Sequence, residues 1–380
     1  MNNRELFGKL NENIVTVIFG CGVVGDYLYQ CIKDSGFKGC IVFCDNAKAK
    51  QGRFQDYEVF SVEKAAEQFP EAVYLILNPI YADVMRQQLY QLGIAEKQII
   101  YALTDEAEDY LMAYRRKGKE QPLPELQFEV DIVSHCNLNC KCCSQFSCIA
   151  EEEYISVEVM ERDFKRLSEL FAGQCKRIYL IGGEPLLHPN LSMCMSIART
   201  YFPKGEISVF TNGLLLLKQK DEFWQICREQ KISIIVTKYP IALDYENIMD
   251  RARKEQVAFK FYTTSEDFKF MINLGLDIDG MQDMEHNFFQ CNEANNCIRL
   301  RAGKLYPCTR PAAIYRFNHY FGFDLQVCES DFIDIYKAVD KDEILRKLAE
   351  PIPFCRYCNV LKERSAMNWG KTEGKLEEWI

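Results

Sequence analysis

The sequence has no long hydrophobic run, no apolar segment at its amino terminus and no excess of positive charge. No window approaches the roughly 18 consecutive apolar residues that indicate a membrane-spanning helix. The first residues, MNNRELFGKLNEN, are polar and lack the apolar centre of a signal peptide. The formal net charge is −9, which disfavours nucleic acid and anionic membranes, because both attract basic surfaces. We therefore expect a cytoplasmic protein that binds neither nucleic acid nor membranes.

Cysteine is the residue type that the chain has in abundance. There are 18 cysteines among 380 residues. Disulfides are rare in a reducing compartment, where clustered cysteines more often bind metals or act in catalysis. Four of the cysteines crowd into the stretch CNLNCKCCSQFS, at Cys136, Cys140, Cys142 and Cys143.

Residues 1–104 alternate short apolar runs with helical patterns. Strand–helix alternation of this kind predicts an α/β domain with a parallel sheet, here a Rossmann-like domain. Residues 105–125 are charged and then rich in Pro and Gly, which predicts a helix followed by a linker near 115–125. The runs that we expect to form strands are 14–19, 40–44, 73–78 and 98–103.

A longer alternation follows in residues 126–285. Repeated β–α units predict a partial (β/α)6 barrel of the TIM type. Residues 286–380 lose this rhythm and predict an irregular, cysteine-rich extension. The expected barrel strands are 128–133, 177–182, 206–210, 232–237 and 257–262.

The first cysteine group has the spacing C-x3-C-x2-C directly after the expected strand 128–133. Neighbouring Cys142 and Cys143 cannot easily form a disulfide. Structural zinc sites favour four ligands in paired knuckles, and no second knuckle lies nearby in sequence. Three thiolates suit an iron–sulfur cluster that keeps one iron open. The group would lie at the carboxyl end of the first barrel strand, where barrel enzymes place their chemistry.

A second motif, Gly182-Gly183-Glu184-Pro185, ends the next expected strand. With C-x3-C-x2-C before it, this order and spacing resembles the radical S-adenosylmethionine (radical SAM) superfamily. The resemblance implies that Cys136, Cys140 and Cys143 hold a [4Fe–4S] cluster whose fourth iron chelates SAM. It also implies that an electron from the cluster cleaves SAM to methionine and a 5′-deoxyadenosyl radical, which abstracts hydrogen from a substrate.

Other positions near these motifs have less settled roles. Glycines 182 and 183 let their backbone approach a ligand closely. Thr211 and Asn212 follow a strand at a place where the family commonly contacts SAM, although a plain capped turn is an equal alternative. The family usually has an aromatic residue before the third cysteine. Here it is Cys142, which is either a spare core thiol or a competing ligand.

The later cysteines form a second set. Their arrangement around Gly303 and a remote C-x2-C resembles the auxiliary-cluster extension of radical SAM enzymes, called SPASM or, in its shorter form, twitch. The resemblance implies a second [4Fe–4S] cluster, and a zinc site is the alternative. Cys297 could replace or join Cys291 as a ligand, so the candidates are Cys291, Cys297, Cys308, Cys355 and Cys358.

The amino-terminal domain carries GCGVVG, in which Gly20, Gly22 and Gly25 match G-x-G-x-x-G between a strand and a helix. Asp45 ends the next strand, where an acid that binds a ribose belongs. The stretch FCDN followed by AKAKQG, residues 43–52, resembles nucleotide-sugar-binding domains of bacterial sugar-modifying enzymes. A nucleotide, a nucleotide-sugar and NAD are candidate ligands, and glycines used only for packing are the alternative.

These patterns together predict a radical SAM enzyme that oxidises or epimerises a small molecule, namely a sugar, a nucleotide-sugar or a glycan precursor. The resemblance implies SAM and a one-electron donor such as flavodoxin or ferredoxin as partners. A peptide-modifying enzyme and a non-catalytic zinc-binding regulatory protein are the alternatives. The sequence identifies no catalytic side chain.

Overall fold

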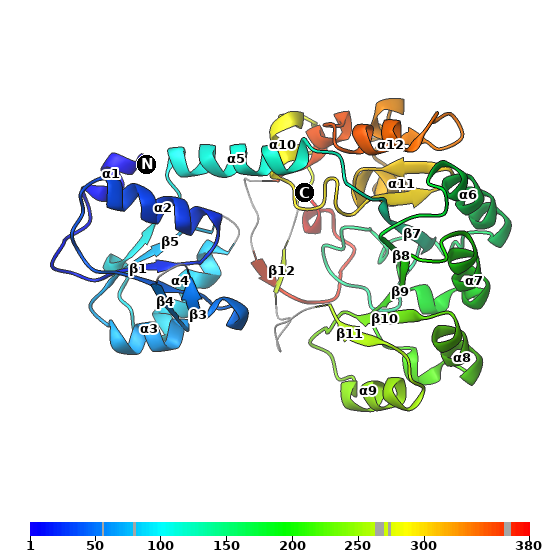
Figure 1. The fold of residues 1–380 in the computed structure, drawn as a ribbon, viewed down its shortest axis with the longest axis horizontal. Helices are drawn as coiled ribbons and strands as arrows, with labels where there is room; N and C mark the ends of the chain where they lie inside the picture. The colour runs from blue at the N-terminus through cyan, green and yellow to red at the C-terminus, as the bar shows by residue number, and fades with distance from the viewer. Residues whose placement is uncertain (55–56, 79–80, 263–269, 273–274, 361–365) are drawn as a thin grey trace. The chain divides into compact units, whose positions relative to one another are not determined.

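The computed structural model describes residues 1–54, 57–78, 81–262, 270–272, 275–360 and 366–380. It contains two compact units, the first built from Met1–Gly118 and the second from Lys119–Val360 and Met367–Ile380. Both units pair helices with largely parallel sheets, so the prediction of an α/β protein with parallel sheets is confirmed. Figure 1 shows the elements of each unit.

Unit 1 has one sheet with the strand order β3-β4-β2-β1-β5-β6. All neighbours are parallel except the hairpin pair β3 and β4. Four of the strands match the predicted apolar runs, whereas the short hairpin was not predicted. The strands are β1 (Thr16–Phe19), β2 (Ile41–Cys44), β3 (Gly52–Phe54), β4 (Tyr57–Phe60), β5 (Val73–Ile76) and β6 (Ile99–Tyr101).

The sheet of unit 1 is covered on both faces, and every position of its central strand β1 is buried. Val17 and Phe19 of β1 join one hydrophobic cluster with α3 and α4, while Ile18 joins another with α1 and α2. Successive side chains of a strand point to opposite faces, so each strand serves both clusters. The helices are α1 (Asn3–Phe7), α2 (Val23–Asp34), α3 (Val62–Gln68), α4 (Ala82–Gln91) and α5 (Asp105–Lys119).

The turn between β1 and α2 depends on Gly25. A Cβ atom at Gly25 would lie 2.2 Å from the Gly20 carbonyl oxygen, whereas one at Gly22 would meet nothing within 4 Å. We expect Gly25→Ala to destabilise unit 1 by about 1–3 kcal/mol, because overpacking forces the backbone apart. Hydrogen–deuterium exchange of the β1 and α2 peptides measures this effect. Gly22→Ala is the matched control, and equal exchange in both variants would contradict the packing role.

Unit 2 contains a sheet with the order β11-β10-β9-β8-β7-β13-β14-β15. The run from β11 to β13 is parallel, and β14 and β15 are added antiparallel. A separate pair joins β12 (Phe270–Ile272) to β16 (Ala366–Asn368). The strands of the large sheet are β7 (Gln127–Val133), β8 (Arg177–Gly182), β9 (Glu206–Thr211), β10 (Ile232–Val236), β11 (Phe259–Phe261), β13 (Arg299–Arg301), β14 (Lys304–Tyr306) and β15 (Ile333–Asp334).

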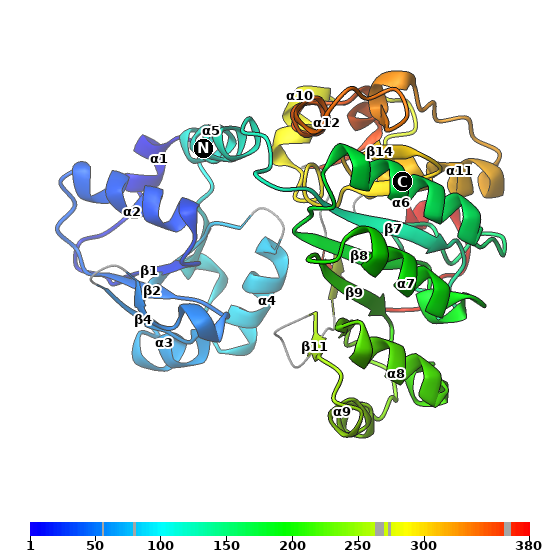
Figure 2. The same ribbon diagram turned by 45° about the vertical axis from the view of Figure 1, so that its right-hand side comes forward.

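One face of this sheet is the core of unit 2. Phe128, Val130 and Ile132 of β7 join a large hydrophobic cluster with residues of α6, α7, α8 and α9. Figure 2 shows α6, α7 and α8 side by side along β7, β8 and β9. The helices of this unit are α6 (Val157–Leu170), α7 (Leu191–Tyr201), α8 (Asp221–Glu229), α9 (Tyr245–Lys254), α10 (Met284–Gln290), α11 (Thr309–Phe321) and α12 (Lys341–Leu348).

The opposite face of the sheet, called the polar face below, carries one row of polar side chains beside apolar ones such as Phe210 and Ile235. Glu129 lies in register between Arg299 and Tyr179, so the three side chains leave the sheet on the same side. Arg299 and Glu129 form an ion pair of 2.9 Å, and burial raises the pKa of Glu129. Continuing the same row, Ser208 and Ser233 are hydrogen-bonded through their hydroxyls at 2.6 Å.

Two predicted boundaries differ from the structure. The linker expected near 115–125 is still helical at its start, because α5 continues through Gly118 to Lys119. The division expected after residue 285 falls inside unit 2. There β13 pairs with β7 and carries the parallel sheet beyond that residue.

Candidate iron–sulfur centre

The loop after β7 brings together the three cysteines of the first motif. The thiols of Cys136, Cys140 and Cys143 lie close enough to influence one another's ionisation. Burial raises the pKa of Cys136 to about 11 and that of Cys140 to about 12. The shifts indicate that the site disfavours three free thiolates, whose charge a bound cation would compensate.

Cys142 does not share this position. It is buried with a φ of 54°, and its main electrostatic neighbours are Glu378 and Lys141. Cys143, the next residue, is third among them. The arrangement favours the spare-thiol interpretation of Cys142 over a competing ligand.

Cys148 is a neighbour that the sequence reasoning missed. Its thiol hydrogen-bonds to Cys143, and this contact lowers the pKa of Cys143 to about 6 and raises that of Cys148. The signal in the sequence was a fifth cysteine five residues after the motif. Cys148 therefore stabilises the thiolate form of Cys143, the form that binds iron.

The GGEP motif packs against the same loop. A Cβ atom at Gly183 would lie 1.8 Å from the His135 carbonyl oxygen, and one at Gly182 would lie 2.3 Å from the Val133 carbonyl oxygen. The Gly183 amide donates to Val133, and the Glu184 amide donates to His135. These glycines therefore let β8 lie close to the cysteine loop. This role is an alternative to the expected one, in which the glycine backbone approaches a ligand.

Glu184 links the GGEP motif to the end of β9. Its buried carboxylate accepts hydrogen bonds from the Thr211 hydroxyl at 2.6 Å and from the Asn212 and Leu186 amides at 2.9 and 3.0 Å. Burial raises its pKa to about 7, and the three donors oppose that shift. Pro185, the last residue of the motif, begins a short 3-10 helix and is also buried.

Asn212 reaches back to the cysteine loop. Its side-chain amide lies 3.7 Å from Cys136 Sγ and donates to Asn137 Oδ1 at 2.8 Å. Asn212 Oδ1 and Thr211 Oγ1 also accept amide hydrogen bonds from the turn that follows, at Leu214 and Gly213. Both residues thus cap a turn, the alternative role considered for them, and both bind Glu184 of GGEP, while Asn212 also reaches the cysteine loop.

The Thr211 hydroxyl can be tested by itself. We expect Thr211→Val to lower the free energy of unfolding by about 1–3 kcal/mol, because the buried Glu184 loses a donor. Tryptophan fluorescence during urea unfolding measures this effect in unit 2, since all three tryptophans, Trp224, Trp369 and Trp379, lie there. Thr211→Ser retains the hydroxyl and should stay near the wild type. Equal losses in the two variants would contradict the role of the hydroxyl.

Four of the five later cysteines surround one small cavity. Its remaining lining includes Asn287, Arg310 and Phe354. The Asn287 amide donates to the carbonyl oxygen of Cys355 at 2.9 Å, which ties α10 to the C-x2-C segment. Burial raises the pKa of the Cys308, Cys355 and Cys358 thiols. The pKa of Cys358 rises to about 11. The cysteines that line the cavity are Cys291, Cys308, Cys355 and Cys358.

Cys297 lies near Cys291 and Glu293 at this cavity but does not line it. It is absent from the lining of that cavity, and its main electrostatic neighbours after burial are Glu129 and Glu293. Tyr179 and Tyr262, on the polar face of the large sheet, also interact with it. The structure therefore groups Cys291 with the other three cysteines and places Cys297 beside the polar face.

The candidate ligands of both sites are cysteine thiols. Within the described ranges, no three His, Cys, Asp or Glu side chains converge as ligands of one metal ion. Each thiolate of a cubic cluster binds a different iron atom, so cluster ligands stand farther apart than the ligands of one ion. Soft sulfur donors of this kind suit iron in such clusters.

The glycine-rich turn of unit 1 has its own geometry. Gly20 has a φ of 126° and Gly22 precedes the first residue of α2 without a side-chain cap. The Asp45 carboxylate accepts the amide hydrogen of Cys21 at 2.8 Å and that of Ala47 at 2.8 Å. Asp45 therefore binds the glycine turn itself, in addition to any role toward a ribose.

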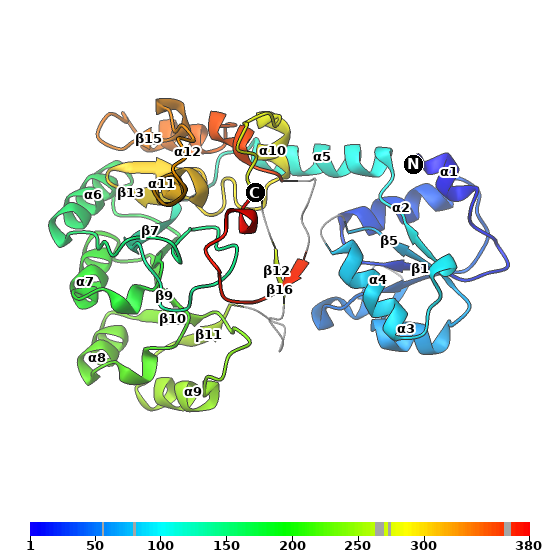
Figure 3. The same ribbon diagram turned by 180° about the vertical axis from the view of Figure 1, so that it is seen from behind.

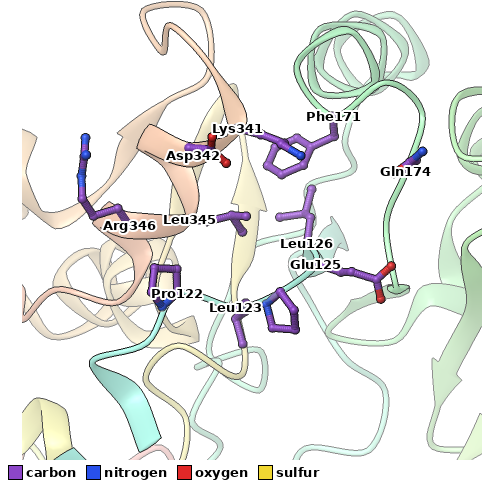
Figure 4. Close-up of a pocket in the computed structure, with 11 residues that line it drawn as sticks. Pro122, Leu123, Glu125, Leu126, Phe171, Gln174, Lys341, Asp342, Leu345 and Arg346 are labelled. Atoms are coloured by element: carbon purple, nitrogen blue, oxygen red, sulfur yellow. The ribbon is translucent and has the colours of Figure 1, made fainter. Parts of the chain in front are cut away.

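A further cavity lies at the other end of the sheet. It has a volume of about 410 Å³, and Leu126 and Leu345 face one another across it (Figure 4). Leu126 precedes β7, and Phe171 and Gln174 precede β8, so the cavity lies at the amino ends of these strands. It is thus separate from the cysteine loop at their carboxyl ends.

Comparison with known families follows this geometry. Residues 130–256 match the family model described as the Radical SAM superfamily. This segment is therefore similar to radical SAM domains. The match includes the cysteine loop, GGEP and the end of β9, so it confirms the resemblance over these residues.

Two curated relatives match part of the chain. A GTP 3′,8-cyclase from Chlorobaculum tepidum is 31% identical over 93 residues, which are 24% of this chain and 27% of that protein. A GTP 3′,8-cyclase from Aliarcobacter butzleri is 29% identical over 92 residues, 23% of this chain and 28% of that protein. The chain therefore spans about a quarter of the length of these relatives.

A solved structure is similar over a longer stretch. The crystal structure of BtrN in complex with AdoMet and 2-DOIA has 21% sequence identity and a TM-score of 0.40, and the alignment covers 63% of this chain and 94% of BtrN.

Among the described residues, none of the helices is long and apolar enough to cross a membrane.

Proposed function

We propose that this protein is a radical SAM enzyme that uses the cysteine loop after β7 to cleave S-adenosylmethionine reductively. The observation that carries the proposal is the convergence of Cys136, Cys140 and Cys143 beside the GGEP backbone, within the segment that matches the family. A [4Fe–4S] cluster held there supplies the electron that breaks the sulfonium bond and yields a 5′-deoxyadenosyl radical.

The chain's own residues fix the position of this chemistry. Glu184 holds the end of β9 against GGEP through Thr211 and Asn212, and Asn212 continues to the Cys136 thiol. Hydrogen bonds therefore join the cysteine loop, the GGEP motif and the turn at Thr211–Gly213 into one network. Such fixed surroundings orient metal ligands and set their basicity.

The second cysteine set supports an auxiliary [4Fe–4S] cluster. Four cysteines around one cavity match the full coordination of a cube, and Cys297 is outside that set. We assign Cys291, Cys308, Cys355 and Cys358 as its ligands. A fully coordinated cluster near the substrate can accept an electron, which favours net oxidation, and epimerisation is the redox-neutral alternative.

The polar face of the large sheet suggests the class of substrate. Arg299, Glu129, Tyr179 and the Ser208–Ser233 pair give charged groups, a phenol and hydroxyls in one row. A row of this kind suits a ligand with many hydroxyl or phosphate groups. We infer a sugar, a nucleotide-sugar or a glycan precursor as substrate, and a flavodoxin or ferredoxin as the one-electron donor.

The strand order of unit 1 supports a nucleotide-binding role. Without the hairpin strand β3, the order is that of a doubly wound sheet, and the glycine turn follows the central strand β1. The amino end of α2 presents amide groups beside this turn, an arrangement that favours phosphate. We interpret unit 1 as a Rossmann-like domain for a nucleotide or nucleotide-sugar, and the large sheet of unit 2 as part of a TIM-type barrel.

Anaerobic purification tests the proposal. We expect brown protein that contains iron and sulfide, and release of 5′-deoxyadenosine when dithionite and SAM are added. Colourless protein that contains only zinc would instead support a zinc-binding regulatory protein. Deuterium transfer from candidate sugars into 5′-deoxyadenosine, read by mass spectrometry, then identifies the substrate class.

A further inference from the structure

The carboxyl-terminal segment 367–380 lies against the loop that carries the first three cysteines (Figure 3). The Lys141 amide donates to the Gly370 carbonyl oxygen at 2.8 Å, and the Thr372 amide donates to the Asn139 carbonyl oxygen at 2.9 Å. Cys140 and Lys371 form an isolated antiparallel bridge between these two bonds. The backbone on both sides of Cys140 is therefore held by the carboxyl-terminal segment.

The same segment brings a side chain to a cysteine sulfur. The indole N–H of Trp369 donates to Cys140 Sγ at 3.3 Å. The Tyr239 side chain also hydrogen-bonds to this thiol, and the rings of Trp369 and Tyr239 lie 6.0 Å apart. Two aromatic side chains thus stand beside Cys140, although the position before Cys143 holds no aromatic residue.

Trp379, ten residues later, provides a natural contrast. Its indole N–H donates to the Cys143 carbonyl oxygen at 3.1 Å, so it holds the loop through the backbone and does not touch a sulfur. Glu378 beside it accepts from the Thr372 hydroxyl and from the Glu373 amide, which closes the segment on itself. Of these two indoles, Trp369 donates to a thiol.

We propose that Trp369 is a positioning residue that raises the reduction potential of the cluster held by the cysteine loop. The inference rests on the proposed function, since it needs a cluster at Cys136, Cys140 and Cys143. One electron enters the oxidised cluster and no bond breaks, so the change is one added negative charge shared by iron and sulfur. A hydrogen bond to a coordinating sulfur stabilises that charge and makes reduction easier.

Trp369→Phe removes the N–H group and keeps an aromatic ring. We expect the equilibrium constant for one-electron reduction of this cluster to fall about tenfold, which corresponds to a potential lower by about 59 mV. Electron paramagnetic resonance during a redox titration of the full chain measures the potential. The signal that changes on addition of SAM identifies the cluster with an open iron and separates it from an auxiliary cluster.

Trp379→Phe is the matched control, because it removes an indole N–H that donates to a carbonyl oxygen on the same loop. Its potential should equal that of the wild type. An unchanged potential in Trp369→Phe, or equal shifts in both variants, would overturn the role of Trp369.

A second measurement covers the case in which Trp369→Phe fails to assemble a cluster. The chain has three tryptophans, so a Trp224→Phe and Trp379→Phe background leaves Trp369 as the only indole. With 15N-labelled tryptophan, the reduced cluster should show a hyperfine coupling to the indole nitrogen. Absence of that coupling would also overturn the role of Trp369. Wild-type protein that forms no SAM-sensitive cluster would instead contradict the proposed function.

Discussion

Cys140→Ala should abolish the release of 5′-deoxyadenosine from SAM. The variant removes one of the three thiols that lie close together, so the remaining two cannot complete the ligand set. Changing even an outer partner of a metal ligand costs about 10–100-fold, so loss of a ligand should cost more than about 100-fold. Chromatography of reactions with dithionite and SAM measures the product, and iron analysis of the same samples shows whether the cluster is lost.

Cys142→Ala is the matched control for this experiment. Cys142 lies in the same loop and is also buried, but Glu378 is its main electrostatic neighbour. We expect this variant to keep its iron and to cleave SAM at the rate of the wild type. Normal cleavage by Cys140→Ala, or a loss in Cys142→Ala as large as in Cys140→Ala, would contradict the ligand assignment.

The double substitution Cys355→Ala and Cys358→Ala should remove the auxiliary cluster and leave the first one in place. We expect iron to fall from about eight to about four atoms per chain, because each cubic cluster holds about four. The remaining cluster should still respond to SAM, since the two cysteine sets belong to different parts of unit 2. Iron analysis after anaerobic reconstitution measures the change.

The substitution Cys297→Ser tests whether Cys291 or Cys297 is a ligand of the auxiliary cluster. Cys297 does not line the cavity formed by the other four cysteines, so its substitution should leave about eight iron atoms per chain. If Cys297→Ser halves the iron, or if the double variant retains all of it, the proposed ligand set is wrong.

The sequence predicted elements that depend on local pattern. The central strands of both sheets were found because buried parallel strands are continuous apolar runs, as in TVIF of β1 and ISIIV of β10. The hairpin of β3 and β4 was missed, because GRF and YEVF are short and mostly solvent-facing. The helical continuation of α5 through Gly118 was missed because a glycine normally suggests the end of a helix.

The candidate site was predictable where its residues share a motif. The three cysteines of the first motif follow one strand and Gly183 follows the next, so parallel pairing alone brings them together. Contacts between distant parts of the chain carried no such signal. Trp369 is 229 residues from Cys140, and Arg316, whose buried ion pair with Asp131 measures 2.6 Å, is 185 residues from its partner.

The choice between Cys291 and Cys297 shows the same limit. Both lie in irregular sequence at similar distances from Cys308, and spacing could not separate them. The fold separates them because α10 ends at Gln290 and places Cys291 at the cavity beside Asn287, whereas Cys297 precedes β13 on the polar face.

The central claim is that three thiols of one loop hold an iron–sulfur cluster with a position open to SAM. Electron paramagnetic resonance of the reduced protein, recorded with and without SAM that carries 15N in its amino group, tests it most directly. The account predicts that SAM alters the spectrum of one cluster and that this cluster couples to the labelled nitrogen. A reduced, iron-loaded protein whose spectrum is the same with and without SAM would contradict it.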